Sequence, residues 1–434
     1  MTNPAAIVAV ASPGRARHAA VAVVMQVVVS VVYSWSVFRH PLTVLHGWSK
    51  AQTIMPYRYT LLCVAIGAMV GGLWQDRRGS RLVASAGGLL VAAGCALSAR
   101  FGGTVVGLVI FYGVLGGLGS GFAYVTPIAN LVKWFPDKRG TMVGLAVLGS
   151  GLSPLFWSPL IEALIGKDPS RFVETIPLTF YLIGAIFLIV VVGAAQFYRV
   201  PPAGWTPAGW VPPATLPRHS IPSRRVLATW QFYALWATFF LSASVGLTAI
   251  GQASLLIQEV ARASAPVSAG VAVGIVGMFN GAGRLGWGAI SDRSGRKIAL
   301  MAMSAVSVFA CVVFLRNAAG FRDAIAGLCL VAFAYGGFLA VMPSLVADFY
   351  GDSSIGGNYG LVFSAWGIAG FLVPGYFEGL LDRARAAGNL AGGYNETYWT
   401  LAAFGLAAAL IAISLRAPLT EWTAGKSRSR NSVS

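Results

Sequence analysis

One arginine interrupts a long apolar run, and its charge is the clearest indication of chemistry in the sequence. Arg284 lies within the apolar residues 268–290, about six residues before the run ends, which is roughly 9 Å along a helix. An arginine at the centre of a membrane helix costs about 2.5–3.5 kcal/mol on insertion scales, so it usually faces a cavity or a partner. No Asp or Glu lies in the middle of any apolar run. We therefore expect Arg284 to bind a carboxylate through a bidentate contact; the alternative is an arginine satisfied by water and helix carbonyls.

Glycines and one amide share the helical face of Arg284. Residues three and four positions apart are neighbours on a helix. This spacing places on one stripe Gly277, Asn280, Gly281, Arg284 and Gly288. The glycines permit close approach of another backbone, and the Asn280 side chain can donate or accept a hydrogen bond beside the cation. We expect Asn280 to help orient the bound anion.

Aromatic side chains in other apolar runs are candidates for the wall of the same cavity. A tyrosine offers an apolar ring and one hydroxyl, which suits a small carboxylate with a short carbon tail. The candidates are Tyr33, Trp35, Tyr124, Tyr335, Phe363 and Trp366. Packing against other helices or against lipid is the alternative role for each of them.

The rest of the sequence indicates what kind of protein positions these residues. Of its 434 residues, 56% are hydrophobic and only 10% are charged, with a mean hydropathy of +0.72. Soluble domains carry about 25% charged residues, so an ordinary soluble protein is excluded. The net charge of +17 could suggest nucleic acid, but the basic residues form short clusters between apolar runs, where they set membrane topology. We expect an integral membrane protein surrounded by lipid, without a nucleic-acid partner.

Twelve apolar segments are predicted to cross the membrane as helices, because each is about as long as a bilayer core is thick. They lie near residues 19–38, 54–75, 82–99, 104–131, 141–162, 177–198, 229–252, 268–290, 298–315, 323–347, 359–381 and 397–415. With the N-terminus inside, most of the 31 Lys and Arg residues fall in inner segments. This bias predicts a multi-pass protein of the inner (plasma) membrane with both termini in the cytoplasm.

A proline-rich segment divides the predicted helices into two sets of six. Residues 199–228 repeat Pro-Ala-Gly-Trp at 202–205 and 207–210. Because prolines favour extended chain, we interpret this segment as a partly extended cytoplasmic linker. The predicted all-α organisation is an N-terminal six-helix bundle (1–198), the linker (199–228), a C-terminal six-helix bundle (229–416) and a cytoplasmic tail (417–434).

The two sets of helices carry copies of one motif. Gly72-x-x-x-Asp76-Arg77-x-Gly79-x-Arg81 recurs as Gly288-x-x-x-Asp292-Arg293-x-Gly295-x-Lys297, displaced by 216 residues throughout. The first glycine permits close helix approach, the acid–base pair can latch neighbouring helix ends, and the second glycine turns the chain. Gating, rather than substrate binding, is the role expected for Asp76, Arg77, Asp292 and Arg293.

The doubled motif and the six-plus-six layout resemble the major facilitator superfamily over nearly the whole chain. Shorter motifs resemble its oxalate:formate antiporter and monocarboxylate transporter group: Tyr33-Ser34-Trp35, Trp134-Phe135-Pro136-Asp137-Lys138-Arg139-Gly140, the Pro-Ala-Gly-Trp linker, Phe279-Asn280-Gly-x-x-Arg284 and Asn358-Tyr359-Gly360. The resemblance implies two helical bundles that alternate access to one central site. It also implies that Arg284 contacts the substrate carboxylate, and family position favours Tyr124 and Tyr335 among the aromatic candidates.

Two positions depart from the resembled group and bear on the substrate. Related proton-coupled transporters often have an acid four residues before the arginine, where this chain has Asn280, so coupling to protons or to a counter-anion stays open. The related oxalate exchanger has a lysine where Trp366 stands, which favours a monovalent anion here. Arg58 is the candidate for a second cation, although it lies only a few residues from the outer end of its predicted helix, where a gate or a structural role is at least as well supported.

No enzyme motif is found in the sequence, which lacks a GxxxxGK[ST] phosphate loop, a GxSxG elbow and an HExxH metal motif. The four cysteines lie in apolar runs without a CxxC pair. We therefore expect no catalytic residue, cofactor or bound metal. The predicted function is a monomeric secondary transporter of small monocarboxylates such as lactate, pyruvate or formate. The alternatives are an exchanger of oxalate or dicarboxylates with formate, a drug or sugar transporter, and a transporter-like membrane sensor that binds a carboxylate.

Overall fold

The computed structural model describes residues 15–202, 205–211, 220–259 and 269–418, which are mostly helical and contain no strand. The helices of the first half are α1 (Arg15–Val29), α2 (Ser36–His46), α3 (Lys50–Arg78), α4 (Ser80–Phe101), α5 (Val105–Leu108), α6 (Gly117–Trp134), α7 (Arg139–Ile165), α8 (Phe172–Ile186) and α9 (Val192–Ala195). Those that follow are α10 (Ser223–Val226), α11 (Trp230–Gly251), α12 (Ala253–Glu259), α13 (Ala269–Ser294), α14 (Arg296–Phe309), α15 (Phe321–Tyr350), α16 (Ile355–Ala386) and α17 (Leu390–Ser414). Short 3-10 helices form at Ser30–Ser34 and Pro169–Arg171, and π-helical stretches at Val109–Gly116, Phe187–Val191 and Ala310–Leu315.

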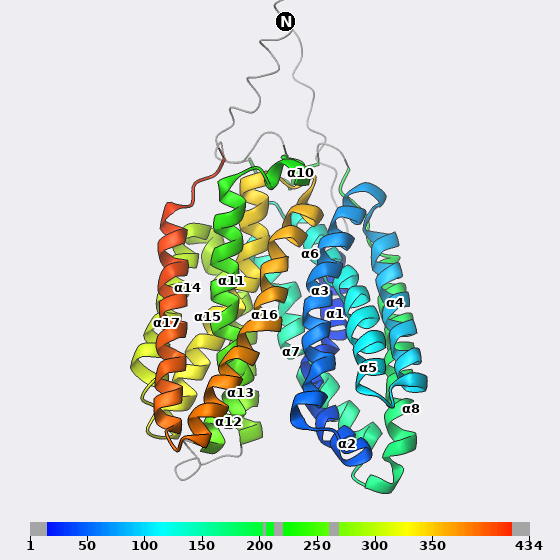
Figure 1. The fold of residues 1–434 in the computed structure, drawn as a ribbon. Coiled ribbons are helices and arrows are strands. Elements are labelled where there is room, and N and C mark those ends of the chain that lie inside the picture. The colour runs from blue at the N-terminus through cyan, green and yellow to red at the C-terminus, as the bar shows by residue number, and fades with distance from the viewer. Residues whose placement is uncertain (1–14, 203–204, 212–219, 260–268, 419–434) are drawn as a thin grey trace, which may run out of the picture.

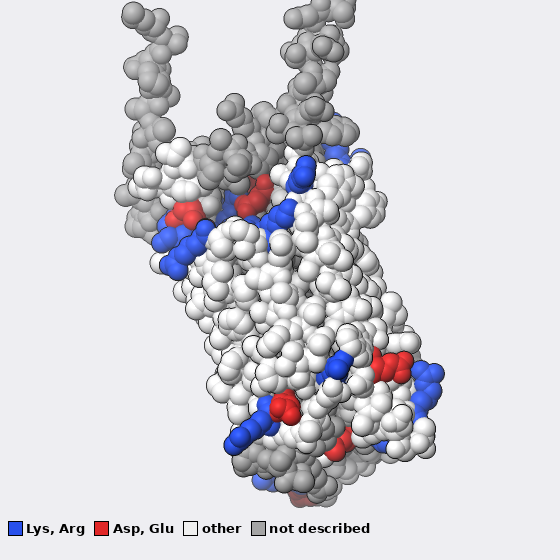
Figure 2. All heavy atoms as spheres, turned by 90° about the vertical axis from the view of Figure 1, so that its left-hand side faces the viewer, with Lys and Arg blue, Asp and Glu red and all other residues white. Residues whose placement is uncertain are grey.

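Eleven helical segments of the described residues are long and apolar enough to cross a membrane. The helix α13 has a comparable length but is not among them, and it carries the polar side chains of Asn280 and Arg284. On one flank of the molecule, charged residues gather toward the two ends and leave a broad uncharged band between them (Figure 2). The chain is therefore an all-α, multi-pass membrane protein, and the predicted count of twelve spans rests on α13.

The helices form two groups side by side, one from residues 15–195 and the other from residues 230–414 (Figure 1). Two seams join the groups, one where α3 packs against α16 and one where α7 packs against α13. We call the end of the molecule that holds α10 and the start of α1 the linker end, and the opposite end the far end (Figure 1). Along α3 the chain runs from the far end to the linker end, and along α16 it runs back.

The helix α3 begins earlier than the apolar pattern predicts, at Lys50 rather than near residue 54. The cause is a capping box: the Ser49 hydroxyl accepts the Gln52 N–H at 3.2 Å, and the Ser49 N–H donates to the Gln52 side chain at 2.9 Å. Arg58 consequently lies eight residues inside α3, roughly 12 Å from its start at 1.5 Å per residue. It is deeper in the helix than expected.

The last part of the linker is docked onto the second group of helices. The Ile221 N–H donates to the Tyr350 carbonyl at the end of α15 at 2.7 Å, and the Asn358 side chain donates to the Ile221 carbonyl at 3.0 Å. The Ser353 N–H donates to the Ser220 hydroxyl at 3.1 Å. Parts of the predicted linker (203–204 and 212–219) and most of the predicted tail (419–434) lie outside the described residues.

The glycines of the repeat serve as turns and as contact points. Gly79 and Gly295 have φ values of 87° and 90°, a conformation that favours glycine, and they turn the chain from α3 into α4 and from α13 into α14. The first glycine of each copy lies so close to a glycine of the other group that a Cβ on either would collide with backbone. These pairs are Gly72–Gly356 across the α3–α16 seam and Gly288–Gly140 across the α7–α13 seam.

Candidate functional site

Arg284 is buried in the α7–α13 seam, with only 2% of its surface exposed. Its Nε donates to Asn280 Oδ1 at 3.0 Å, and its Nη1 donates to the Val147 carbonyl on α7 at 2.7 Å. Within the described residues, no Asp or Glu forms an ion pair with it. The guanidinium therefore joins the two groups of helices through neutral acceptors alone.

Asn280 holds the Arg284 side chain in this direction. The Asn280 Nδ2 donates to the Ala332 carbonyl on α15 at 3.2 Å, which turns its Oδ1 toward Arg284. Gly151 on α7 leaves room for the guanidinium, since a Cβ there would lie 3.4 Å from the Arg284 Nε and 3.1 Å from the Gly281 Cα. Asn280 is thus a positioning residue whose amide is already engaged by protein groups.

Tyr33 meets Arg284 at a break in the first membrane segment. Between α1 and α2 the chain forms the 3-10 helix Ser30–Ser34, and short 3-10 stretches inside longer helices often mark hinges. The Tyr33 side chain lies near the Arg284 guanidinium. The first predicted span, 19–38, is therefore both interrupted and longer than expected, because α2 continues to His46.

A small cavity lies beside Tyr33, with a volume of about 20 Å³, room for about one water molecule. It is lined by Val29, Ser30, Val32, Tyr33, Val64, Ser120, Tyr124, Phe363 and Trp366. The lining comes from α1 and its 3-10 continuation, α3, α6 and α16, so both groups of helices contribute to it. Four aromatic residues singled out from the sequence are brought together here: Tyr33, Tyr124, Phe363 and Trp366.

The aromatic residues of the cavity form a stack. The Phe363 ring lies between those of Tyr124 and Trp366, with ring centroids 4.9 and 5.0 Å away. Tyr335 on α15 stands behind this stack, where its hydroxyl accepts the indole N–H of Trp366 at 2.7 Å. Tyr335 therefore supports Trp366 from behind and does not itself line the cavity.

Two serines that line the cavity were not predicted from the sequence, and one tryptophan that was predicted to line it lies elsewhere. Ser30 and Ser120 each lie one helical turn before a cavity tyrosine, so the three-to-four spacing rule could have found them. Trp35 does not line the cavity. Its indole N–H donates to the Thr53 carbonyl at 2.8 Å, and its ring is buried in the core of the first group.

Arg58 is engaged at the far end of the α3–α16 seam. Its Nε and Nη2 donate to the Phe371 carbonyl on α16 at 3.2 and 2.8 Å, and its guanidinium lies 5.1 Å from the centroid of the Phe371 ring. Along α3, Arg58 lies six residues, roughly 9 Å, from the cavity residue Val64, on the side of the far end. In this conformation it does not supply a second cation to the cavity.

The two acids of the repeat accept hydrogen bonds from the N-terminus of a helix in the opposite group. Asp76 on α3 accepts the N–H groups of Gly356 and the next residue of α16 at 3.2 and 2.7 Å. Asp292 on α13 accepts the N–H groups of Gly140 and Thr141 on α7 at 2.9 and 2.7 Å. A carboxylate is favoured there because it meets free N–H groups and the positive end of the helix dipole.

Ion pairs that the sequence did not indicate surround Asp292. Arg296 pairs with Asp292 at 2.6 Å and with Asp348 on α15 at 3.1 Å. Arg139 at the start of α7 pairs with the same Asp348 at 2.9 Å. The only sequence signal for Asp348 is its place near the end of an apolar run, which does not identify its partners.

The basic residues that follow the acids in the repeat do not enter these contacts. Arg77 and Arg293 are exposed, and neither forms an ion pair within the part of the chain that the structure describes. Residues one position apart point to different sides of a helix, so an acid that faces the seam turns its neighbour away from it. Asp76 instead pairs with Lys133 on α6, at 3.7 Å.

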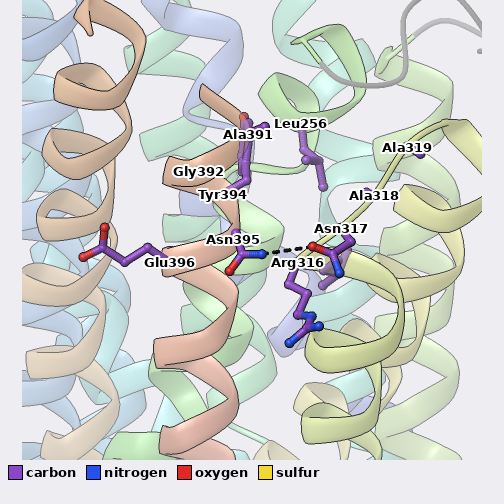
Figure 3. A pocket seen from close by; sticks show the side chains of 11 residues that line it. Leu256, Arg316, Asn317, Ala318, Ala319, Ala391, Gly392, Tyr394, Asn395 and Glu396 are labelled. Carbon is purple, nitrogen blue, oxygen red and sulfur yellow. Dashed lines mark hydrogen bonds between the residues drawn. The ribbon is translucent and has the colours of Figure 1, made fainter. Parts of the chain in front are cut away.

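A larger cavity, of about 460 Å³, lies apart from all these residues. It is found at the far end of the second group, between α12, the end of the π-helical stretch Ala310–Leu315 and the start of α17 (Figure 3). The side-chain amides of Asn317 and Asn395 are hydrogen bonded there, 2.9 Å apart (Figure 3). None of the site residues predicted from the sequence lines this cavity.

The chain resembles known transporters in sequence and in fold. The sequence profile of the Major Facilitator Superfamily matches residues 18–374. Over 351 residues the chain is 30% identical to the uncharacterized MFS-type transporter YhjX of Escherichia coli (strain K12), covering 80% of this chain and 83% of that protein. It is 28% identical over 344 residues to the oxalate:formate antiporter of Oxalobacter formigenes, covering 79% and 78%. The crystal structure of the transporter FucP in the outward conformation matches with a TM-score of 0.67 and 15% identity, covering 91% of this chain and 98% of that one.

Proposed function

Because the chain belongs to the Major Facilitator Superfamily, we propose that it is a secondary transporter of small organic anions, in particular monocarboxylates such as lactate, pyruvate or formate. The observation that carries this proposal is Arg284, which is buried and has no acid in ion-pair contact among the described residues. A carboxylate would give the guanidinium a charged acceptor, and hydrogen bonds to charged groups are about twice as strong as neutral ones.

In this mechanism Arg284 anchors the carboxylate, and Asn280 keeps the guanidinium in place. The Tyr33 hydroxyl stands beside the cation as a further donor, while Tyr124, Phe363 and Trp366, supported by Tyr335, meet the carbon tail. The cavity of about 20 Å³ is too small for such an anion and is not lined by Arg284, so its walls must separate during the transport cycle. With one cation, a second carboxylate would be buried unpaired, which disfavours dianions.

Alternating access supplies the movement of these walls. The two groups of helices would act as six-helix halves, residues 1–198 and 229–416, that rock around the Arg284 site, with α13 as the twelfth span. Asp76 and Asp292 would hold the linker end closed in the conformation described here. That end would face the cytoplasm, with both termini inside and the monomeric protein in the inner membrane.

Exchange of oxalate with formate is the second candidate, favoured by the sequence similarity to the Oxalobacter antiporter. It would require a second cation near the substrate, and Arg58 would have to leave the Phe371 carbonyl to become one. Exchange with a counter-anion or symport with a proton could supply the driving force, and Asn280 in place of the acid of the proton-coupled relatives weighs against symport. A membrane sensor would bind a carboxylate without moving it.

Uptake by purified protein in liposomes separates these functions. We expect labelled lactate, pyruvate or formate to enter proteoliposomes faster than protein-free liposomes, and oxalate to compete weakly. Preloading with formate tests exchange, and an imposed pH gradient tests proton coupling. Strong competition by oxalate would favour the exchanger, and binding without uptake would favour a sensor. If no carboxylate is bound or taken up by folded protein, the proposed substrate class is wrong.

A further inference from the structure

Arg58 makes more contacts with α16 than an arginine that only faces lipid would need. Two nitrogens of one guanidinium converge on the Phe371 carbonyl, at 3.2 and 2.8 Å, and the same guanidinium lies over the Phe371 ring. Gly375, one turn further along α16, leaves the space that the guanidinium occupies, because a Cβ there would lie 3.1 Å from Arg58 Nη2. The two helices belong to opposite groups, so this contact joins the groups.

The acceptor is a helix carbonyl beside a proline. Pro374 lies inside α16, three residues after Phe371. A proline within a helix donates no N–H to the carbonyl four residues before it, here that of Gly370, and tends to kink the helix, so Phe371 lies in a weakened turn of α16. The Phe371 carbonyl nevertheless remains a neutral acceptor. A carboxylate that reached Arg58 would bind it more strongly, because the hydrogen bond would then join two charged groups.

Among the residues that the structure describes, the other seam has no such contact at its far end. Beyond Gly281, the face of α13 that packs on α7 carries Gly274 and Gly277, and a Cβ at either position would meet nothing within 4 Å. On the α3–α16 seam, in contrast, close contacts continue from Gly367 against Ala65 as far as the Arg58 contact. Among the described residues, contacts thus join the two groups along the α3–α16 seam up to Arg58, whereas the α7–α13 seam is open around Gly274 and Gly277.

We propose that Arg58 is an anion-operated latch: it holds α3 and α16 together on the far-end side of the cavity, and a small carboxylate entering from the far end releases it by replacing the Phe371 carbonyl. The transient complex of Arg58 with the carboxylate is an entry site, distinct from the buried Arg284 site. Only the identity of the anion rests on the proposed function; the latch does not. No covalent step is involved, only exchange of one hydrogen-bond acceptor for another.

The test measures the distance between the two groups at the far end. The four buried native cysteines are first replaced. Spin labels are then attached at Val44→Cys on α2 and Leu255→Cys on α12, because the native side chains at these positions are 46% and 37% exposed. Pulsed electron paramagnetic resonance then gives the distance distribution in liposomes. Sodium lactate is the probe. Its control is lactamide, which is uncharged, in a buffer with the same chloride concentration.

In otherwise unmodified protein, lactate should increase the population of long distances and lactamide should not. Arg58→Gln should raise the ratio of open to closed molecules without lactate by roughly tenfold or more, the factor that loss of a hydrogen bond to a charged group carries, and should abolish the lactate response. Arg58→Lys, which keeps a donor and a charge, should lie between. Arg100→Gln is the matched control, since Arg100 is also at the far end and, within the described part of the chain, its guanidinium lies over the ring of its neighbour Phe101 and forms no ion pair.

A folded Arg58→Gln protein with the original distances and lactate response would overturn the latch. If lactate fails to move the labels of the unmodified protein while labelled lactate still enters the same proteoliposomes, the anion-operated release is wrong and the proposed function stands. If the labels respond as expected but uptake is absent, the latch is supported and the transport proposal fails. Elution as a single species from size-exclusion chromatography establishes that each variant is folded.

Discussion

At the linker end, the α3–α16 seam and the α7–α13 seam repeat the same contact. In each, a carboxylate of one group accepts two backbone N–H groups at the start of a helix in the other group. In each, a pair of glycines brings the two backbones together beside it. The displacement of the motif by 216 residues in the sequence thus corresponds to an equivalent contact in space.

Away from that end the seams differ. The α7–α13 seam has a buried arginine at its centre, Arg284, and is open at the far end around Gly274. The α3–α16 seam has small residues at its centre, where Gly367 meets Ala65, and an arginine at its far end, Arg58. The repeated motif therefore specifies the backbone contact at the linker end, whereas the arginines lie at different places in the two seams. In our proposals, substrate binding belongs to the α7–α13 seam and far-end closure to the α3–α16 seam.

The largest effect should come from removing the charge of the α7–α13 seam. We expect Arg284→Ala to lower the uptake of labelled lactate by about a hundredfold or more, the usual consequence of truncating one partner of a buried charged hydrogen bond. Arg284→Lys should also be impaired, because an ammonium does not replace a planar guanidinium. The exposed Arg77→Ala serves as control. Normal uptake by folded Arg284→Ala protein would contradict the assignment.

A second test compares how much Asp76 and Asp292 each contribute to the rate of transport. Asp292 pairs with Arg296 at 2.6 Å, whereas Asp76 is 3.7 Å from Lys133. We therefore expect Asp292→Asn to reduce the maximal uptake rate about tenfold and Asp76→Asn only a few-fold, since an amide keeps the shape but loses the charge-assisted hydrogen bonds. Initial rates at several lactate concentrations separate the two parameters. Changes confined to KM in both variants would show that neither acid acts in gating.

Trp366→Lys would give the α3–α16 seam a central cation of its own. We expect lactate uptake to fall several-fold, because a charge replaces an aromatic ring that stacks on Phe363 and donates to Tyr335. Competition by oxalate should strengthen in the same variant, since a second carboxylate would no longer be buried unpaired. The measurement is inhibition of labelled lactate uptake by oxalate. Strong inhibition by oxalate in the unmodified protein would refute the monovalent assignment.

The smallest effect, and the one with a pH dependence, is expected for Asn280→Asp. An aspartate there would pair with the Arg284 Nε that Asn280 now contacts and would compete with the substrate for the cation. A carboxylate paired with an arginine is charged at neutral pH and loses this charge when it is protonated in acid. Uptake should therefore be a few-fold lower than in unmodified protein at pH 7 and should recover as the pH falls. A pH profile parallel to that of the unmodified protein would contradict this expectation.

Much of the fold could be predicted from local properties of the sequence. Apolar runs of bilayer length identify membrane helices, because a helix satisfies its backbone hydrogen bonds within the segment, whereas an isolated extended segment in lipid would leave them unpaired. The same argument is weakest for α13, where Asn280, Arg284 and several glycines reduce the apolar character. Helix starts were less accessible, since the capping box at Ser49 depends on hydrogen bonds rather than hydropathy.

For the candidate site, spacing along a helix was sufficient and partners across a seam were not. The three-to-four spacing placed Asn280 beside Arg284 correctly in space, because both lie on one helix. The partner of Arg58 is 313 residues away, and the partners of Asp76 are 280 and 281 residues away. Nothing in a local pattern selects such partners.

Hydropathy and periodicity are sufficient to predict the all-helical membrane character of this protein, its repeated motif and one arginine deep in a helix of membrane length. These properties arise within a single helix. The contacts of Asp76 and Asp292 with helix N-termini, the exposure of Arg77 and Arg293, and the contact of Arg58 with Phe371 instead of the cavity appear only once the helices are packed. Contacts between helices depend on where the packed helices approach one another, which is set by close-packing of the whole molecule.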